Sequence, residues 1–160
     1  MEVRPKMAMA ENTGDAPQLA MTAPQLMEYL DEVFPQLKTN GPPIHVEHVE
    51  PYKARLRMEF TESELRPGGT LSGPTMFKLA DVSFYCCLLA MIGPVPLAVT
   101  TNMSINFIRK PTQSDLLADV RILKLGKRLA VGEVTLYSDG SDEPVAHVTG
   151  TYSVPPPEKR

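Results

Sequence analysis

The 160-residue sequence lacks the features that mark several common protein classes. It has only two cysteines, no long run of lysine and arginine, and no apolar segment near Met1. Because the formal net charge is -3 and no basic stripe is present, we expect no nucleic-acid partner. With no apolar core of a signal peptide and no disulfide framework, we expect a cytoplasmic protein.

The two cysteines and the longest apolar run belong to one segment. Cys86 and Cys87 are neighbours in a predicted helix, where their side chains point about 100° apart, so we expect free thiols in the core. Residues 82–99 are uncharged over roughly the length of a membrane span. Gly93, Pro94 and Pro96 interrupt this run, which favours a buried core helix and no membrane partner.

Residues 66–93 are the centre around which the chain is organised. A glycine-rich loop ends at Pro74, which fits the first turn of a helix, and residues 75–92 contain no glycine or proline. Nearly every position in this helix is apolar, so we expect it to be buried on all sides. Lys78 can extend outward on its long stem, but a carboxylate at Asp81 is costly there unless it has a partner or a function.

The rest of the chain predicts a single α+β domain over residues 22–155, between a flexible tail at 1–21 and a short tail at 156–160. Residues 22–37 have helical periodicity, with a capping box of Thr22 and Gln25. Alternating strands are predicted at 44–50, 52–60, 102–107, 116–122, 130–136 and 146–154, with a bulge near Leu123. Short connections favour an antiparallel sheet, one face of which wraps the apolar helix.

Three short motifs follow one another in this order along the chain. They are Gly-Thr-Leu-Ser-Gly-Pro at 69–74, Leu-Ala-Asp at 79–81, and Ser-Ile-Asn-Phe-Ile-Arg-Lys-Pro at 104–111. Over residues 51–154 the sequence resembles the hotdog-fold acyl-CoA thioesterases of the PaaI-like, phenylacetate-pathway branch. The resemblance implies a hotdog fold, hydrolysis of an acyl-CoA to free acid and CoA, and a homodimer, often doubled to a homotetramer. It implies no cofactor, since coenzyme A is part of the substrate.

The resemblance also implies a set of site residues. Gly73 and Asp81 occupy the family positions, whereas Arg66 stands in place of the family asparagine and Ser72 in place of the histidine. The family's activating serine or threonine falls on Thr100 by alignment, but strand alternation places Thr101 on the side of the inward-facing residues. Both threonines therefore remain candidates.

The residues suit thioester hydrolysis. Amide groups at the helix N-terminus, those of Gly73 and Thr75, can stabilise an oxyanion, and Asp81 can act as general base or nucleophile. The alternative for Asp81 is a buried carboxylate that caps a backbone group, and the alternative function is a non-catalytic acyl-CoA binding or sensing protein. Ser72 lacks the sequence context of a serine hydrolase nucleophile.

Histidines and basic residues are the remaining candidates for metal and phosphate binding. His45 and His48 point to opposite faces of a strand, so no metal site is expected. Five basic residues are candidates for the phosphates of coenzyme A, with a solvated rim as the alternative: Arg109, Lys110, Lys124, Lys127 and Arg128.

The predicted site needs two chains. Gly73 and Asp81 are eight residues apart on one helix, or roughly 12 Å along its axis. A carboxylate and an oxyanion donor must both lie within about 3 Å of one reacting centre. We therefore expect Gly73 of one chain to face Asp81 of another across a two-fold axis.

Overall fold

The computed structural model describes residues 16–159, so residues 1–15 of the predicted N-terminal tail and Arg160 lie outside the described residues. The helices are α1 (Ala23–Val33), α2 (Gln36–Thr39) and α3 (Gly73–Ile92). The six long strands are β1 (Ile44–Glu50), β2 (Lys53–Met58), β5 (Val99–Phe107), β6 (Leu116–Leu125), β7 (Leu129–Ser138) and β8 (Pro144–Ser153). A two-stranded ribbon, β3 (Leu65–Arg66) and β4 (Thr70–Leu71), precedes α3, and 3₁₀ turns occupy Glu62–Glu64 and Pro157–Lys159.

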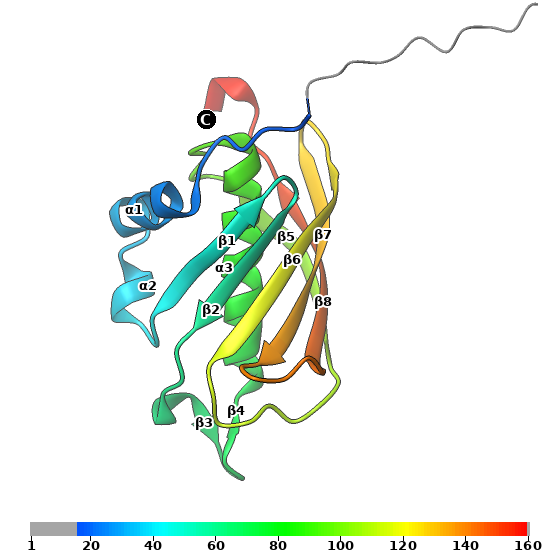
Figure 1. Cartoon of the computed structure of the whole chain (residues 1–160). Helices are drawn as coiled ribbons and strands as arrows, with labels where there is room; N and C mark the ends of the chain where they lie inside the picture. The colour runs from blue at the N-terminus through cyan, green and yellow to red at the C-terminus, as the bar shows by residue number, and fades with distance from the viewer. Residues whose placement is uncertain (1–15, 160) are drawn as a thin grey trace, which may run out of the picture.

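The six long strands form one antiparallel sheet in the order β1-β2-β6-β7-β8-β5. Figure 1 shows α3 running along one face of this sheet, and the helix contacts all six strands. The predicted α+β hotdog fold, a sheet wrapped around a long apolar helix, is thus confirmed. The predicted bulge is also present, because the register of β6 against β7 shifts between Ile122 and Lys124.

α3 is buried along most of its length, as its composition predicts. Ser72 caps its N-terminus, Pro74 lies in its first turn, and Gly93 ends it with a φ of 88°, a conformation that favours glycine. By length and composition this helix could also cross a membrane, but 72% of its most apolar window is buried inside the protein. A core helix that a sheet encloses meets the same criteria of length and composition.

The prediction of one helix over residues 22–37 is correct at its start and wrong at its end. The capping box is present, since Gln25 N donates to Thr22 Oγ1 (3.4 Å) and Thr22 N donates to Gln25 Oε1 (2.8 Å). α1 ends at Val33, and Pro35 is the N-cap of the separate helix α2, because proline interrupts helical hydrogen bonding. α1 packs against β1 and α3 and brings its C-terminal end beside the central helix.

The described residues that precede α1 are attached to the fold. The backbone N–H groups of Ala20 and Met21 both donate to Ala90 O, at 2.7 and 3.2 Å, and Met21 is buried. Carbonyl groups in the last turn of a helix lack hydrogen-bond donors within the helix, and Ala20 and Met21 supply donors to one of these carbonyls. The ordered domain therefore begins before residue 22.

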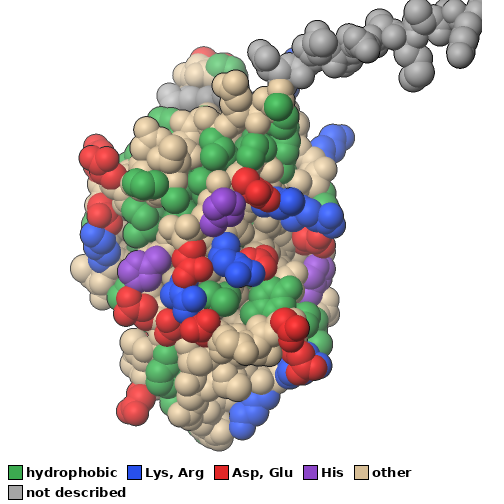
Figure 2. All heavy atoms as spheres, in the orientation of Figure 1, with side chains coloured by type: hydrophobic (Ala, Val, Ile, Leu, Met, Phe, Trp, Pro, Cys, Tyr) green, Lys and Arg blue, Asp and Glu red, His purple; other side chains and the backbone are tan. Residues whose placement is uncertain are grey.

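The outer face of the sheet carries charges of both signs. Figure 2 shows acidic, basic and histidine side chains interspersed across this face. They form ion pairs such as Arg55 with Asp119 (2.6 Å) and Arg121 with Glu133 (2.7 Å). The inner face is apolar towards α3, whereas the outer face is largely polar, with Leu123, Leu129 and Val131 also exposed.

Candidate functional site

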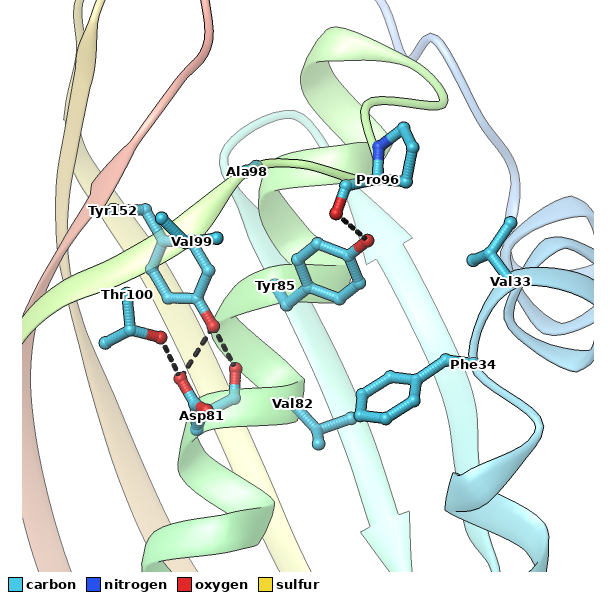
Figure 3. A pocket seen from close by; sticks show the side chains of 10 residues that line it. All are labelled: Val33, Phe34, Asp81, Val82, Tyr85, Pro96, Ala98, Val99, Thr100 and Tyr152. Atoms are coloured by element: carbon cyan, nitrogen blue, oxygen red, sulfur yellow. Dashed lines mark hydrogen bonds between the residues drawn. The ribbon is translucent and has the colours of Figure 1, made fainter.

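Asp81 lies near the middle of α3 and is the hydrogen-bond acceptor at the centre of the site. Its Oδ1 atom accepts from the Thr100 hydroxyl at 2.5 Å and from the Tyr152 hydroxyl at 2.6 Å (Figure 3). The Tyr152 oxygen is also 2.9 Å from the main-chain oxygen of Asp81. No described residue donates a hydrogen bond to Oδ2, so both hydroxyls hold one carboxylate oxygen and leave the other available.

Strand register brings the two hydroxyls together. Thr100 on β5 is paired with Tyr152 on β8, so their side chains share the sheet face that packs on α3. The register of this strand pair shifts between Thr100 and Asn102, which makes Thr101 the bulged residue. Thr101 is exposed and donates to Thr151 O (3.1 Å), so of the two candidate threonines Thr100 contacts Asp81 and Thr101 does not.

Tyr152 is a site residue that the sequence analysis missed. It is 3% exposed, and its ring stacks on Phe84 with centroids 4.9 Å apart and planes 5° from parallel. Burial raises the pKa of Tyr152, and the negative charge of Asp81 raises it further, so the hydroxyl stays protonated and remains a donor. The available signal was a tyrosine on the predicted inward face of the last strand, because a buried tyrosine hydroxyl usually has a partner.

Phe84, which supports Tyr152, is itself fixed by a glycine. A Cβ atom at Gly132 would lie 2.7 Å from the Phe84 ring and 2.7 Å from Arg121 O. Real side chains do not approach that closely, so the ring occupies space that only glycine leaves free. The sheet thereby fixes Phe84, and Phe84 fixes the tyrosine that holds Asp81.

Asp81 lies at the edge of a pocket of about 410 Å³. Its lining comes from α1, α3, the loop before β5, and strands β5 and β8: Val33, Phe34, Asp81, Val82, Tyr85, Pro96, Ala98, Val99, Thr100 and Tyr152. Figure 3 shows Phe34 directed from the end of α1 towards Val82 on α3. The carboxylate therefore adjoins an apolar pocket large enough for a small organic group.

The N-terminus of α3 is the second part of the predicted site. Thr75 N donates to the Ser72 hydroxyl oxygen (3.3 Å), and Met76 N donates to Ser72 O (3.2 Å). Pro74 has no N–H, and no described residue accepts a hydrogen bond from Gly73 N. The prediction that the Thr75 amide is an available oxyanion donor is therefore wrong, because the helix cap occupies it, and Gly73 is the free donor of this turn.

Ser72 has a structural task at this cap. The Thr75 hydroxyl donates to Glu64 Oε2 at 2.5 Å, and the Ser72 and Thr75 hydroxyl oxygens are 2.7 Å apart. Since the single hydroxyl proton of Thr75 is directed to Glu64, the Ser72 hydroxyl donates to Thr75. Through these contacts Ser72 acts as the N-cap of α3.

Gly73 opens onto a pocket of about 790 Å³ that is separate from the Asp81 pocket. A Cβ at position 73 would lie 3.0 Å from the ring of Phe107, the last residue of β5. Arg66, Arg109 and Lys110 are the charged residues in the lining, and none of the described residues that line this pocket is acidic. The two pockets share no lining residue, in agreement with the separation of Gly73 and Asp81 along one helix.

The five basic candidates do not gather in one place within a chain. On β8, Ala146 pairs with Phe107, while Ser153 pairs with Leu129, seven residues or roughly 23 Å away. Arg109 and Lys110 follow Phe107, whereas the other three lie at the hairpin next to Leu129: Lys124, Lys127 and Arg128. Arg128 donates to Val154 O (3.1 Å) at that far end.

The remaining polar candidates show no site in the described part of the chain. No group of three histidine, cysteine or acidic residues within residues 16–159 is arranged to hold a metal ion. His45 contacts Glu59 (2.6 Å), and His147 contacts Glu133 (3.0 Å). Burial raises the pKa of the Cys86 and Cys87 thiols to about 12, which leaves both unreactive.

The chain is similar to known proteins in sequence. The Thioesterase superfamily matches residues 68–145. A protein from Saccharolobus solfataricus that is provisionally named an esterase is 30% identical over 111 residues, which are 69% of this chain and 73% of that protein.

It is also similar to solved structures. A protein from Silicibacter sp. that is provisionally named a thioesterase is 46% identical, with a TM-score of 0.80 over 89% of this chain and 97% of that one. A variant of the phenylacetic acid degradation protein PaaI from Thermus thermophilus is 26% identical, with a TM-score of 0.65 over 76% of this chain and 99% of that one.

Proposed function

The chain belongs to the thioesterase superfamily and is a PaaI-like hotdog protein that hydrolyses thioesters, and we propose that its substrates are acyl esters of coenzyme A. The observation that carries this proposal is the Asp81 carboxylate, held at Oδ1 by Thr100 and Tyr152 beside an apolar pocket. Of the two interpretations left open for Asp81, the catalytic one accounts for a carboxylate with one free oxygen at a pocket edge.

Asp81 can start the reaction in either of two ways. As a general base, Oδ2 removes a proton from a water molecule whose oxygen attacks the thioester carbonyl carbon. As a nucleophile, Oδ2 attacks that carbon itself and gives a mixed anhydride, which water then hydrolyses. In both cases the C–S bond breaks, the acyl group leaves as the free acid, and the thiolate takes up a proton to give CoA.

The developing oxyanion needs a donor, and the Gly73 N–H group is suited to this task. It is unpaired among the described residues and lies at the positive end of the α3 dipole. Arg66, Arg109 and Lys110 surround the same pocket, and their charges suit the phosphates of coenzyme A. We assign the CoA portion to this pocket and leave out Lys124, Lys127 and Arg128, which do not line it.

We further propose that Gly73 and Asp81 come from different chains of a homodimer. β5 is at the edge of the sheet, and Val99, Phe107 and Ile108 on or next to it are each 54% exposed. An open strand edge of this kind can pair with a second copy. Gly73 adjoins Phe107, and Asp81 is bonded to Thr100, at opposite ends of β5.

Those two contacts determine the register of pairing. If β5 pairs antiparallel with β5 of a second copy and the two-fold axis lies at Ser104, Phe107 of one chain faces Thr100 of the other, because the bulged residue Thr101 takes no partner. Gly73 of the first chain then approaches Asp81 of the second, and two equivalent sites form. A cysteine at Ser104 tests the register, since antiparallel partners near the axis lie close enough for a symmetric disulfide.

Three measurements test the proposed function. A panel of acyl-CoA substrates with detection of free thiol should show turnover, whereas binding of CoA esters without turnover would favour the non-catalytic alternative. Asp81→Asn keeps the shape of the side chain and should lower kcat by about a hundredfold or more. Mixing Asp81→Asn chains with Gly73→Val chains should restore up to one working site per heterodimer, and proven heterodimers without activity would exclude a shared site.

A further inference from the structure

The apolar pocket beside Asp81 is built partly from a region outside the family match. Val33 and Phe34 form one wall from the end of α1, whereas the superfamily match begins at residue 68. The two side chains are 38% and 37% exposed, so they are available at the pocket surface. This wall is therefore a feature of the present chain that membership of the superfamily does not specify.

Every hydroxyl that lines the pocket is already in use. The Tyr85 hydroxyl donates to Pro96 O (3.3 Å), and the hydroxyls of Thr100 and Tyr152 both donate to Asp81. Burial raises the pKa of Tyr85 to about 12, so its hydroxyl is not a source of negative charge. Asp81 is the sole charged residue among the described residues that line the pocket. The described side chains of the pocket thus offer a bound group apolar surface and no free hydroxyl donor.

We propose that this pocket binds the acyl group of the substrate and selects uncharged, apolar acyl groups against those that carry a terminal carboxylate or hydroxyl. This inference rests on the proposed function, because a thioester carbonyl beside Asp81 places its acyl group next to this pocket. A terminal carboxylate there would lose water without gaining a donor and would face the charge of Asp81. A terminal hydroxyl would lose water without gaining a partner.

Val33 and Phe34 limit the length of acyl group that fits. Figure 3 shows the Phe34 ring directed from the end of α1 towards Val82 on α3, so this ring forms the α1 side of the pocket. Each methylene that enters apolar surface should raise kcat/KM about fourfold. This gain should stop at the length where the chain reaches the Phe34 wall. Shortening Phe34 therefore moves the preferred acyl group to greater length.

The first test compares matched acyl groups on the wild-type protein. Hexanoyl-CoA and adipoyl-CoA have the same number of acyl carbons, but the latter ends in a carboxylate. The expected kcat/KM ratio is about a hundredfold or more in favour of hexanoyl-CoA, with omega-hydroxyhexanoyl-CoA between them. Equal hydrolysis of hexanoyl-CoA and adipoyl-CoA would overturn the inference.

The second test changes the wall. Phe34→Ala and Val33→Ala should raise the decanoyl-to-hexanoyl ratio of kcat/KM about fivefold or more, whereas Val131→Ala should leave this ratio unchanged. Val131 is a matched control, because it is also 38% exposed but lies on β7 away from the pocket. Val33→Arg supplies a cation and should shift the preference towards adipoyl-CoA. A decanoyl-to-hexanoyl ratio that changes as much in Val131→Ala as in Phe34→Ala and Val33→Ala would overturn the assignment of the wall.

Binding separates this inference from the proposed hydrolysis. Calorimetry with the non-hydrolysable thioethers hexyl-CoA and carboxypentyl-CoA should show tighter binding of hexyl-CoA by wild-type protein. That result without any turnover of acyl-CoA would refute the hydrolysis and leave the pocket assignment standing. Turnover that depends on Asp81, together with equal binding of both thioethers, would refute the pocket assignment alone.

Discussion

Replacing Tyr152 with phenylalanine removes one hydroxyl from Asp81 and leaves the aromatic ring in place. The ring keeps its stacking contact with Phe84, at 4.9 Å between centroids, so the apolar packing is unchanged. The carboxylate loses the donor at 2.6 Å but keeps Thr100 at 2.5 Å on the same oxygen. Asp81 is then held by one hydroxyl and can rotate away from the reacting carbonyl.

The expected loss follows from the strength of that bond. A hydrogen bond to a charged group is worth about 1.5–3 kcal/mol, which corresponds to a fall in kcat of about 10- to 100-fold if the bond positions the base. KM should change little, because the ring that lines the pocket remains. A purely structural tyrosine would instead lower the melting temperature and leave the kcat of the folded fraction intact.

The assay is steady-state release of free thiol from an acyl-CoA, with kcat and KM determined separately and folding monitored by thermal denaturation. Tyr137→Phe, on β7 away from Asp81, is the matched control and should keep wild-type kcat. In the double variant with Thr100→Val the two losses should not be additive, since both hydroxyls hold one oxygen. A folded Tyr152→Phe protein with kcat within about twofold of wild type would refute the positioning role.

The same structure makes three further predictions. Thr100→Val should lower kcat by about tenfold or more, whereas Thr101→Val, which removes an exposed hydroxyl on the bulge, should not. Equal effects of the two substitutions in the same thiol-release assay would contradict the assignment of Thr100 as the threonine that holds Asp81. Ser72→Ala should lower the free energy of unfolding by about 1 kcal/mol through loss of the α3 cap, and urea denaturation measures it. The hydrogen bond from Arg121 lowers the pKa of Glu133, so the stabilisation from Glu133 is present above its unfolded pKa of about 4.3 and is lost as the pH falls through the lower folded value. Glu133→Gln should therefore be less stable than wild type at neutral pH, and the difference should shrink in denaturation curves below about pH 4.

The sequence by itself determined the local structure. The apolar composition of residues 75–92 specifies a buried helix, and the alternation in the later strands specifies which residues face it. The sequence also predicted the capping box of Thr22 and Gln25 and the bulge near Leu123, because each depends on residues close together in the chain. Asp81 stood out for the same reason, as a carboxylate within an apolar helix.

Only the tertiary structure decided which groups contact Asp81. Thr100 is 19 residues away and Tyr152 is 71 residues away, so neither contact follows from local spacing. Simple alternation favoured Thr101, but the bulge that β5 forms against β8 changes the phase of the strand and turns Thr100 inward. Long-range pairing also separated Arg109 from Arg128 at opposite ends of the sheet. Secondary structure is encoded by neighbours in sequence, whereas the site depends on strand register, which is fixed when the sheet closes around α3.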